Sequence, residues 1–101
     1  MTLTARYSPD VQQDINERIE YFESRSDSVA DRFRKAVEET VRMLCGSPNM
    51  GERFRGDPTG TVRYRSVLKF RNYLIFYRQE GMDLQVLRIL HGAMDYDNLF
   101  D

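Results

Sequence analysis

His91 is the single histidine of the chain, and it follows an apolar segment that also carries Arg78 and Arg88. An imidazole exchanges protons near neutral pH, and a guanidinium can bind phosphate oxygens through two parallel hydrogen bonds. Together with Arg65, these side chains could hold a phosphodiester and transfer the proton that its cleavage requires. The sequence therefore offers one candidate catalytic set: His91, Arg65, Arg78 and Arg88.

Other roles for these residues remain open. A histidine at the end of a strand can donate a hydrogen bond to loop backbone, or it can contact a partner protein. The two arginines of the segment could instead form structural ion pairs with Asp83, Asp95 or Asp97. Residue types alone do not choose between catalysis, partner binding and a structural role.

Residue counts argue against a metal site or a bound nucleotide. One histidine and one cysteine fall short of the spaced ligand pairs of zinc sites. Cys45 ends a helical apolar pattern and is expected to fill the core. The glycines at positions 56 and 60 lack the Lys-Ser/Thr ending of a phosphate-binding loop. We expect no metal and no cofactor.

The charge pattern favours a protein partner over nucleic acid. Fifteen basic residues oppose 16 acidic ones, for a net charge of −1, so bulk attraction to phosphates is weak. Between residues 53 and 78, however, Asp57 is the sole acidic residue among many arginines. Arginine and tyrosine are typical interface anchors, although a solvated strand face is the alternative. The candidate partner-binding residues are Arg63, Tyr64, Arg65, Arg78, Arg88, His91 and Tyr96.

The first half of the chain predicts a strand and two helices. Residues 3–7 alternate between apolar and polar, which is typical of a strand. Ser8 is expected to cap a first helix, because proline and aspartate follow it and apolar residues then recur every three or four positions. Asp27 or Ser28 is expected to cap a second helix, whose apolar stripe runs to Gly46.

The second half predicts three strands. The segment 46–60 is rich in glycine and proline and predicts a loop. Residues 61–67 alternate, whereas residues 70–78 and 84–90 are almost continuously apolar and predict central strands. Residues 79–82 form the turn between the last two. Short connections favour an antiparallel meander.

These elements predict one α+β domain spanning residues 1–101. Its order is β-α-α-β-β-β, with a helical hairpin packed on one face of a mainly antiparallel four-stranded sheet. The strand at 3–7 can join this sheet parallel to a later strand. Tyr73, Phe76 and Tyr77 are core candidates, and the short C-terminal tail is expected to fold back over a groove through its apolar side chains.

The sequence also bears on the compartment. No apolar run approaches the roughly 20 residues that span a bilayer, and residues 1–5 lack the charged and apolar regions of a secretory signal. We expect a cytoplasmic protein that does not enter a membrane.

Several phrases of the sequence resemble the RelE/ParE superfamily of bacterial type II toxins. The specific ones are Ile75-Phe-Tyr-Arg78 and Leu90-His-Gly-Ala-Met-Asp95, supported by Tyr7-Ser-Pro and the Ser47–Gly51 loop. They are more similar to the ParE branch than to the RelE branch. Met94 departs from the pattern, because ParE-like chains often have arginine there.

The resemblance implies a toxin that inhibits growth by binding DNA gyrase and that is neutralised by a cognate ParD-like antitoxin. It also implies that the toxin–antitoxin pair serves in plasmid stabilisation. The alternative is a RelE-like, ribosome-dependent mRNA interferase, which would use the candidate catalytic set. The near-neutral net charge does not favour binding to RNA, so direct nucleic-acid binding is not expected. A non-catalytic, protein-binding toxin is the leading interpretation.

Overall fold

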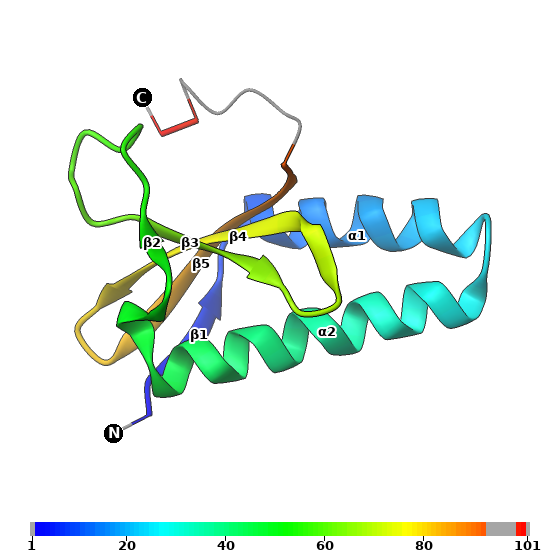
Figure 1. The fold of residues 1–101 in the computed structure, drawn as a ribbon, viewed down its shortest axis with the longest axis horizontal. Coiled ribbons are helices and arrows are strands. Elements are labelled where there is room, and N and C mark those ends of the chain that lie inside the picture. Colours follow the sequence, from blue (N-terminus) through cyan, green and yellow to red (C-terminus); the bar gives the residue numbers. More distant parts are fainter. Residues whose placement is uncertain (1, 93–98, 101) are drawn as a thin grey trace.

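The computed structural model of the chain describes residues 2–92 and 99–100. In order, they form β1 (Thr4–Tyr7), α1 (Pro9–Glu23), α2 (Asp27–Gly46), the 3-10 turn η1 (Pro48–Met50), β2 (Glu52–Arg53), β3 (Arg63–Val67), β4 (Phe70–Glu80) and β5 (Asp83–His91). Figure 1 shows α1 and α2 running side by side along the sheet. None of the helices in this part of the chain is long and apolar enough to cross a membrane.

The strands form a single sheet in the order β1-β5-β4-β3-β2. β1 is parallel to β5, and the other pairs are antiparallel. The predicted α+β fold is confirmed, but the sheet has five strands where four were predicted. The additional strand, β2, lies inside the predicted loop 46–60. Because its two residues are both charged and exposed, no apolar alternation marks it in the sequence.

Serine hydroxyls cap both helices. The Oγ of Ser8 accepts a hydrogen bond from the N–H three residues ahead at 3.0 Å, which confirms the predicted cap of α1. The Oγ of Ser26 does the same for α2 at 3.4 Å. The predicted cap, Asp27 or Ser28, was wrong by one or two residues. Residues 26, 27 and 28 are all of a type that can cap a helix, and the position where α1 ends decides which of them caps α2.

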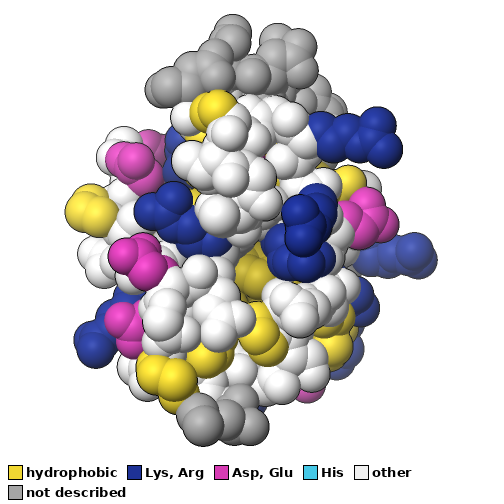
Figure 2. Space-filling model, turned by 90° about the vertical axis from the view of Figure 1, so that its left-hand side faces the viewer, with side chains coloured by type: hydrophobic (Ala, Val, Ile, Leu, Met, Phe, Trp, Pro, Cys, Tyr) yellow, Lys and Arg dark blue, Asp and Glu magenta, His cyan; other side chains and the backbone are white. Residues whose placement is uncertain are grey.

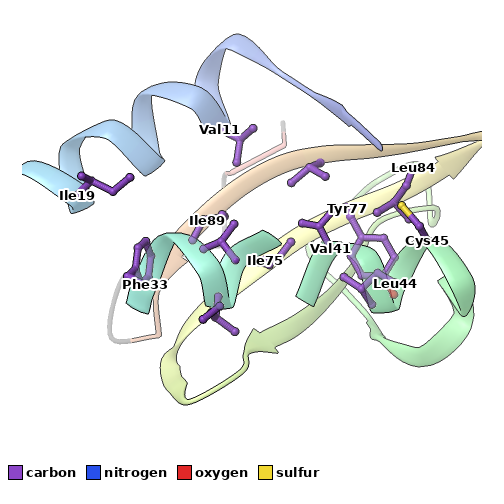
Figure 3. Packing of buried hydrophobic residues seen from close by; sticks show 14 of the residues in the cluster. Val11, Ile19, Phe33, Val41, Leu44, Cys45, Ile75, Tyr77, Leu84 and Ile89 are labelled. Carbon is purple, nitrogen blue, oxygen red and sulfur yellow. The ribbon is translucent and has the colours of Figure 1, made fainter. Parts of the chain in front are cut away.

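The helices enclose the main core against one face of the sheet. Phe33 of α2 is fully buried, as are Ile75 and Tyr77 of β4, and Figure 3 shows these side chains between the helices and the strands. Cys45 is buried beside them, as predicted. Burial of each large apolar side chain stabilises the fold by about 1.5–3 kcal/mol, so this face supplies most of the stability.

A smaller apolar cluster covers the opposite face of the sheet, which we call the open face because neither α1 nor α2 lies on it. The last two described residues, Leu99 and Phe100, pack on this cluster. The expectation that the apolar tail folds back is thereby confirmed for these two residues. Its buried members are Val62, Phe76 and Leu90, and its half-buried members are Phe54, Tyr64, Leu74, Leu87, Leu99 and Phe100.

Candidate partner-binding surface

A break in the register between β4 and β5 directs Arg88 towards α1. The strand pairing skips Leu87, which is typical of a β-bulge. Nε and Nη2 of Arg88 then donate to the two carboxylate oxygens of Asp14 at 2.7 and 2.9 Å. These hydrogen bonds raise the pKa of the Arg88 guanidinium, although its burial acts in the opposite direction. The partner of Arg88 is thus not Asp83, as the sequence suggested, and positions 95 and 97 lie outside the described residues.

Arg63 and Arg65 lie on the helix side of β3 and fasten the η1 turn to the sheet. Nη1 of Arg63 donates to the carbonyl of Gly51 at 2.8 Å, and Nη1 of Arg65 donates to the carbonyl of Met50 at 3.1 Å. Next to them, the buried hydroxyl of Tyr77 accepts from the Gly51 N–H at 2.9 Å and donates to the Pro48 carbonyl at 2.7 Å. A side chain at Gly51 would collide with this hydroxyl, so the position requires glycine. Both arginines therefore have a structural role.

Tyr64 and Arg78 are the candidate residues that β3 and β4 place on the open face. The Tyr64 hydroxyl donates to Glu52 Oε2 at 2.8 Å, and this hydrogen bond raises the pKa of the tyrosine. Nη2 of Arg78 lies 3.9 Å from Glu80 Oε2, which corrects the predicted pairing with Asp83. Nε of Arg78 is buried and has no hydrogen-bond partner among the described residues. Of the predicted arginines, Arg78 is the least tied to the fold.

His91 is the last residue of β5, as predicted, and its ring packs edge-on against Tyr73 at a centroid distance of 5.2 Å. Together with Arg88, it lines a small cavity of about 140 Å³ beside α1. Tyr96, the last of the predicted binding residues, lies outside the described residues.

Asp57 organises the loop between β2 and β3. Its carboxylate accepts hydrogen bonds from the Thr59 N–H and hydroxyl at 3.1 and 2.6 Å, from the Thr61 N–H at 2.8 Å and from the Val62 N–H at 3.0 Å. Burial alone would raise the pKa of Asp57, but these hydrogen bonds lower it to about 2. The carboxylate therefore stays ionised and fixes the loop beside the sheet.

The fixed loop and the open face enclose a groove of about 850 Å³. Its floor consists of aromatic rings. The ring centroid of Phe76 lies 5.1 Å from that of Phe54 and 5.8 Å from that of Tyr64. Arg53, at the end of β2, and Arg55, in the loop, belong to its lining, and we call these two residues its rim. We call this groove the loop groove, and its lining residues are Glu52, Arg53, Phe54, Arg55, Gly56, Tyr64, Leu74 and Phe76.

The end of the molecule that carries this loop and the β4–β5 turn is rich in basic side chains. In Figure 2, which faces this end, Lys and Arg side chains lie on both sides of a central group of hydrophobic atoms, and Asp and Glu side chains lie further out. Among the described residues, neither Arg53 nor Arg55 forms an ion pair with a carboxylate. An apolar floor with a basic rim is suited to an acidic segment that carries large apolar side chains.

Comparisons with known proteins assign the chain to a family. A model of the ParE toxin of the type II toxin–antitoxin system parDE matches residues 5–96. The chain belongs to the ParE toxin family. Among solved structures, a chain of the chromosomal ParDE toxin–antitoxin system from P. aeruginosa has the same fold, with a TM-score of 0.72 and 18% identity over 89% of this chain and 96% of that chain. A search among curated proteins finds no match.

In this ParE-family fold, the candidate catalytic set does not converge as a whole, because His91 and Arg88 line one small cavity that neither Arg65 nor Arg78 lines. Arg78 and Tyr73, the strand neighbour of His91, are five residues apart on β4, which separates them by about 17 Å. Arg65 is turned towards η1, and Arg88 is engaged by α1. Within the described part of the chain, no group of three or more His, Cys, Asp or Glu side chains could hold a metal ion.

Sequence reasoning missed the loop groove of this ParE-family chain. Phe54 lies between two arginines in a segment rich in glycine and proline, and this was the available signal: a lone aromatic in a loop needs an apolar surface on which to pack. The importance of Asp57 could not be foreseen, because its hydrogen bonds depend on the backbone path of the loop.

Proposed function

We propose that this chain is a growth-inhibiting toxin that acts in the cytoplasm by binding DNA gyrase, without catalysis of its own, and that a ParD-like antitoxin neutralises it. The observation that carries the proposal is the loop groove, a concave surface of aromatic rings whose two rim arginines form no ion pair within the described part of the chain. Membership of the ParE family supports the pairing with an antitoxin. The same kind of surface suits binding to a protein target.

The arrangement of the arginines supports protein binding over RNA cleavage. Cleavage requires an acid, a base and phosphate-binding cations around one phosphodiester. Here Arg63, Arg65 and Arg88 are committed to backbone carbonyls or to Asp14, on the helix side of the sheet. The donors used in these hydrogen bonds are held by the fold and become available to a phosphate only if those contacts break.

Expression of the chain in a bacterial host tests the target. We expect growth arrest with DNA breaks and a DNA-damage response, rescue by co-expression of a cognate ParD-like protein, and inhibition of supercoiling by purified gyrase. Rapid cleavage of ribosome-bound mRNA that is lost in His91→Ala would instead establish the interferase alternative. Normal growth with undamaged DNA and RNA would contradict both.

Variants of the loop groove test the surface. Reversal of charge in Arg53→Glu/Arg55→Glu should weaken binding to the antitoxin or to gyrase at least about tenfold, because both arginines stand at the rim. The matched control is Arg32→Glu/Arg34→Glu, which reverses the same charges on α2. An equal loss in both double variants would show that net charge, not the loop groove, governs binding.

A further inference from the structure

Leu99 and Phe100 lie on the aromatic floor beside the loop groove. The ring centroid of Phe100 is 5.7 Å from that of Phe54 and 6.0 Å from that of Phe76. Both pairs are edge-to-face, which is a geometry that aromatic pairs prefer. Leu99 packs on the same cluster. The open face therefore already receives one short apolar segment, supplied by the chain itself.

The composition of that segment matches the chemistry of the loop groove. Residues 95–101 read Asp-Tyr-Asp-Asn-Leu-Phe-Asp, which contains three carboxylates and three large apolar side chains and no basic residue. The rim of the loop groove offers the opposite charge through Arg53 and Arg55, whereas Glu52 accepts a hydrogen bond from Tyr64. The tail thus has the properties expected of an external occupant, namely negative charge around an aromatic anchor.

We propose that the C-terminal residues Leu99 and Phe100 are a built-in competitor for this surface, and that the antitoxin binds it through an acidic segment whose aromatic or leucine anchor takes the place of Phe100. This inference rests on the proposed function, since it identifies the groove that the antitoxin uses and a contact that regulates access to it. Phe54 and Phe76 line the loop groove and also contact Phe100, so an occupant that packs on these two rings would compete with Phe100.

Competition of this kind has a measurable size. The apparent dissociation constant of a partner is its intrinsic value divided by the fraction of molecules whose site is vacant. If the tail occupies the surface in about nine molecules out of ten, removal of its anchors tightens binding of a partner about tenfold.

The chain's own tail provides a probe that needs no identified antitoxin. A fluorescein-labelled peptide with the sequence of residues 95–101 is titrated into the full-length chain and into its Leu99→Ser/Phe100→Ser variant, and anisotropy is recorded. We expect the peptide to bind the variant about tenfold more tightly than the wild type. A peptide with Phe100→Ala should bind neither, and Arg53→Glu/Arg55→Glu added to the variant should weaken binding.

Two controls separate competition from altered folding. Met82→Ser removes an exposed apolar side chain at the β4–β5 turn and should leave peptide binding unchanged. The milder full-length variant Phe100→Ala should show the same direction of effect if the double variant unfolds, as judged by circular dichroism. Equal affinity of wild type and variants for the peptide, or no binding to any of them, would overturn the proposal.

A second measurement addresses the antitoxin. The ParD-like protein should displace the labelled peptide and should bind the Leu99→Ser/Phe100→Ser chain more tightly than the wild type. Binding of the antitoxin without displacement would overturn the shared site, even where the toxin and its antitoxin behave as proposed. Failure of gyrase inhibition would leave the peptide result intact, so the two proposals fail separately.

Discussion

The two faces of the sheet use the same residue types in opposite ways. On the helix side, Arg63, Arg65, Tyr77 and Arg88 each bind a defined carbonyl or carboxylate, and the main core lies between the helices and the strands. On the open face, the aromatic rings form a floor that the loop leaves partly uncovered, and arginines stand at the rim without ion-pair partners among the described residues.

This difference shows why abundance of arginine and tyrosine is a poor guide to a binding site. A guanidinium that is hydrogen-bonded to the fold has a fixed orientation and fewer donors left for a partner, whereas an arginine without such contacts exchanges only its hydration for the partner. The face with fewer fixed contacts is therefore the one expected to bind. Substitutions on the two faces should separate stability from recognition.

The largest contrast is expected between two phenylalanines. Phe33→Ala should lower the free energy of unfolding by about 3–5 kcal/mol, because Phe33 is fully buried between α2 and the sheet. Phe54 is half-buried in the floor of the loop groove. Phe54→Ala should lower the free energy of unfolding by no more than about 1 kcal/mol, yet it should weaken partner binding more than tenfold. Urea denaturation and a binding titration measure the two quantities. Similar stability losses would show that the open face is part of the core.

The ion pair between β5 and α1 should give the next largest effect. Asp14→Ala leaves the Arg88 guanidinium and the N–H of Ile89 without their acceptor. Because 28% of the Arg88 side chain remains exposed, we expect a loss of roughly 2–3 kcal/mol, at or below the lower limit for a fully buried pair. A double-mutant cycle with Arg88→Met measures the coupling. Zero coupling would show that the bulge does not depend on the pair.

Asp57 tests the loop of the open face through pH. Its pKa is lowered from 3.8 to about 2, so it contributes stability that is present above pH 4 and is lost as the pH falls through about 2. Asp57→Asn should cost about 2 kcal/mol at neutral pH through the lost charged hydrogen bonds, and it should weaken partner binding because the wall of the loop groove loosens. Acid titrations of both proteins, followed by fluorescence, should differ between pH 4 and 2. If the two acid titrations coincide, the Asp57 carboxylate does not stabilise the loop.

Sequence alone predicted the fold because local signals agreed with one another. Ser8 and Pro9 start α1, the dense apolar runs of β4 and β5 require burial on both sides, and the short turn at Gly81 forces them to be antiparallel. Each signal depends on neighbours in the chain. The two-residue β2 was missed because it has no apolar period and is held in place by β3.

The site was harder to predict, because its contacts join distant residues. Asp14 and Arg88 are 74 positions apart, and only the bulge at Leu87 brings them together. His91 was correctly placed at the end of a strand, but the sequence could not show that it packs against Tyr73. An alternating strand pattern indicates that Arg63 and Arg65 share a face, yet it does not indicate which face the helices cover.

A pair of tyrosine-to-phenylalanine changes gives the finest test of the two faces. Tyr77→Phe leaves the buried N–H of Gly51 and the carbonyl of Pro48 unsatisfied, so we expect a loss of about 1–3 kcal/mol. Tyr64→Phe removes one exposed hydrogen bond to Glu52, and its cost should be within about 0.5 kcal/mol. Thermal and urea unfolding measure both.

The dependence on alkaline pH gives a further test of the buried Tyr77. Burial raises the pKa of Tyr77 above 10.0, although the hydrogen bond from Gly51 and the nearby arginines act in the opposite direction. Because the unfolded chain then loses the phenolic proton first, wild-type stability should fall as the pH rises above about 10. Tyr77→Phe should lack this part of the decline, so its deficit relative to wild type should shrink at high pH. A deficit that stays constant from pH 8 to 11 would show that the phenol of Tyr77 is not protected by the helix-side core.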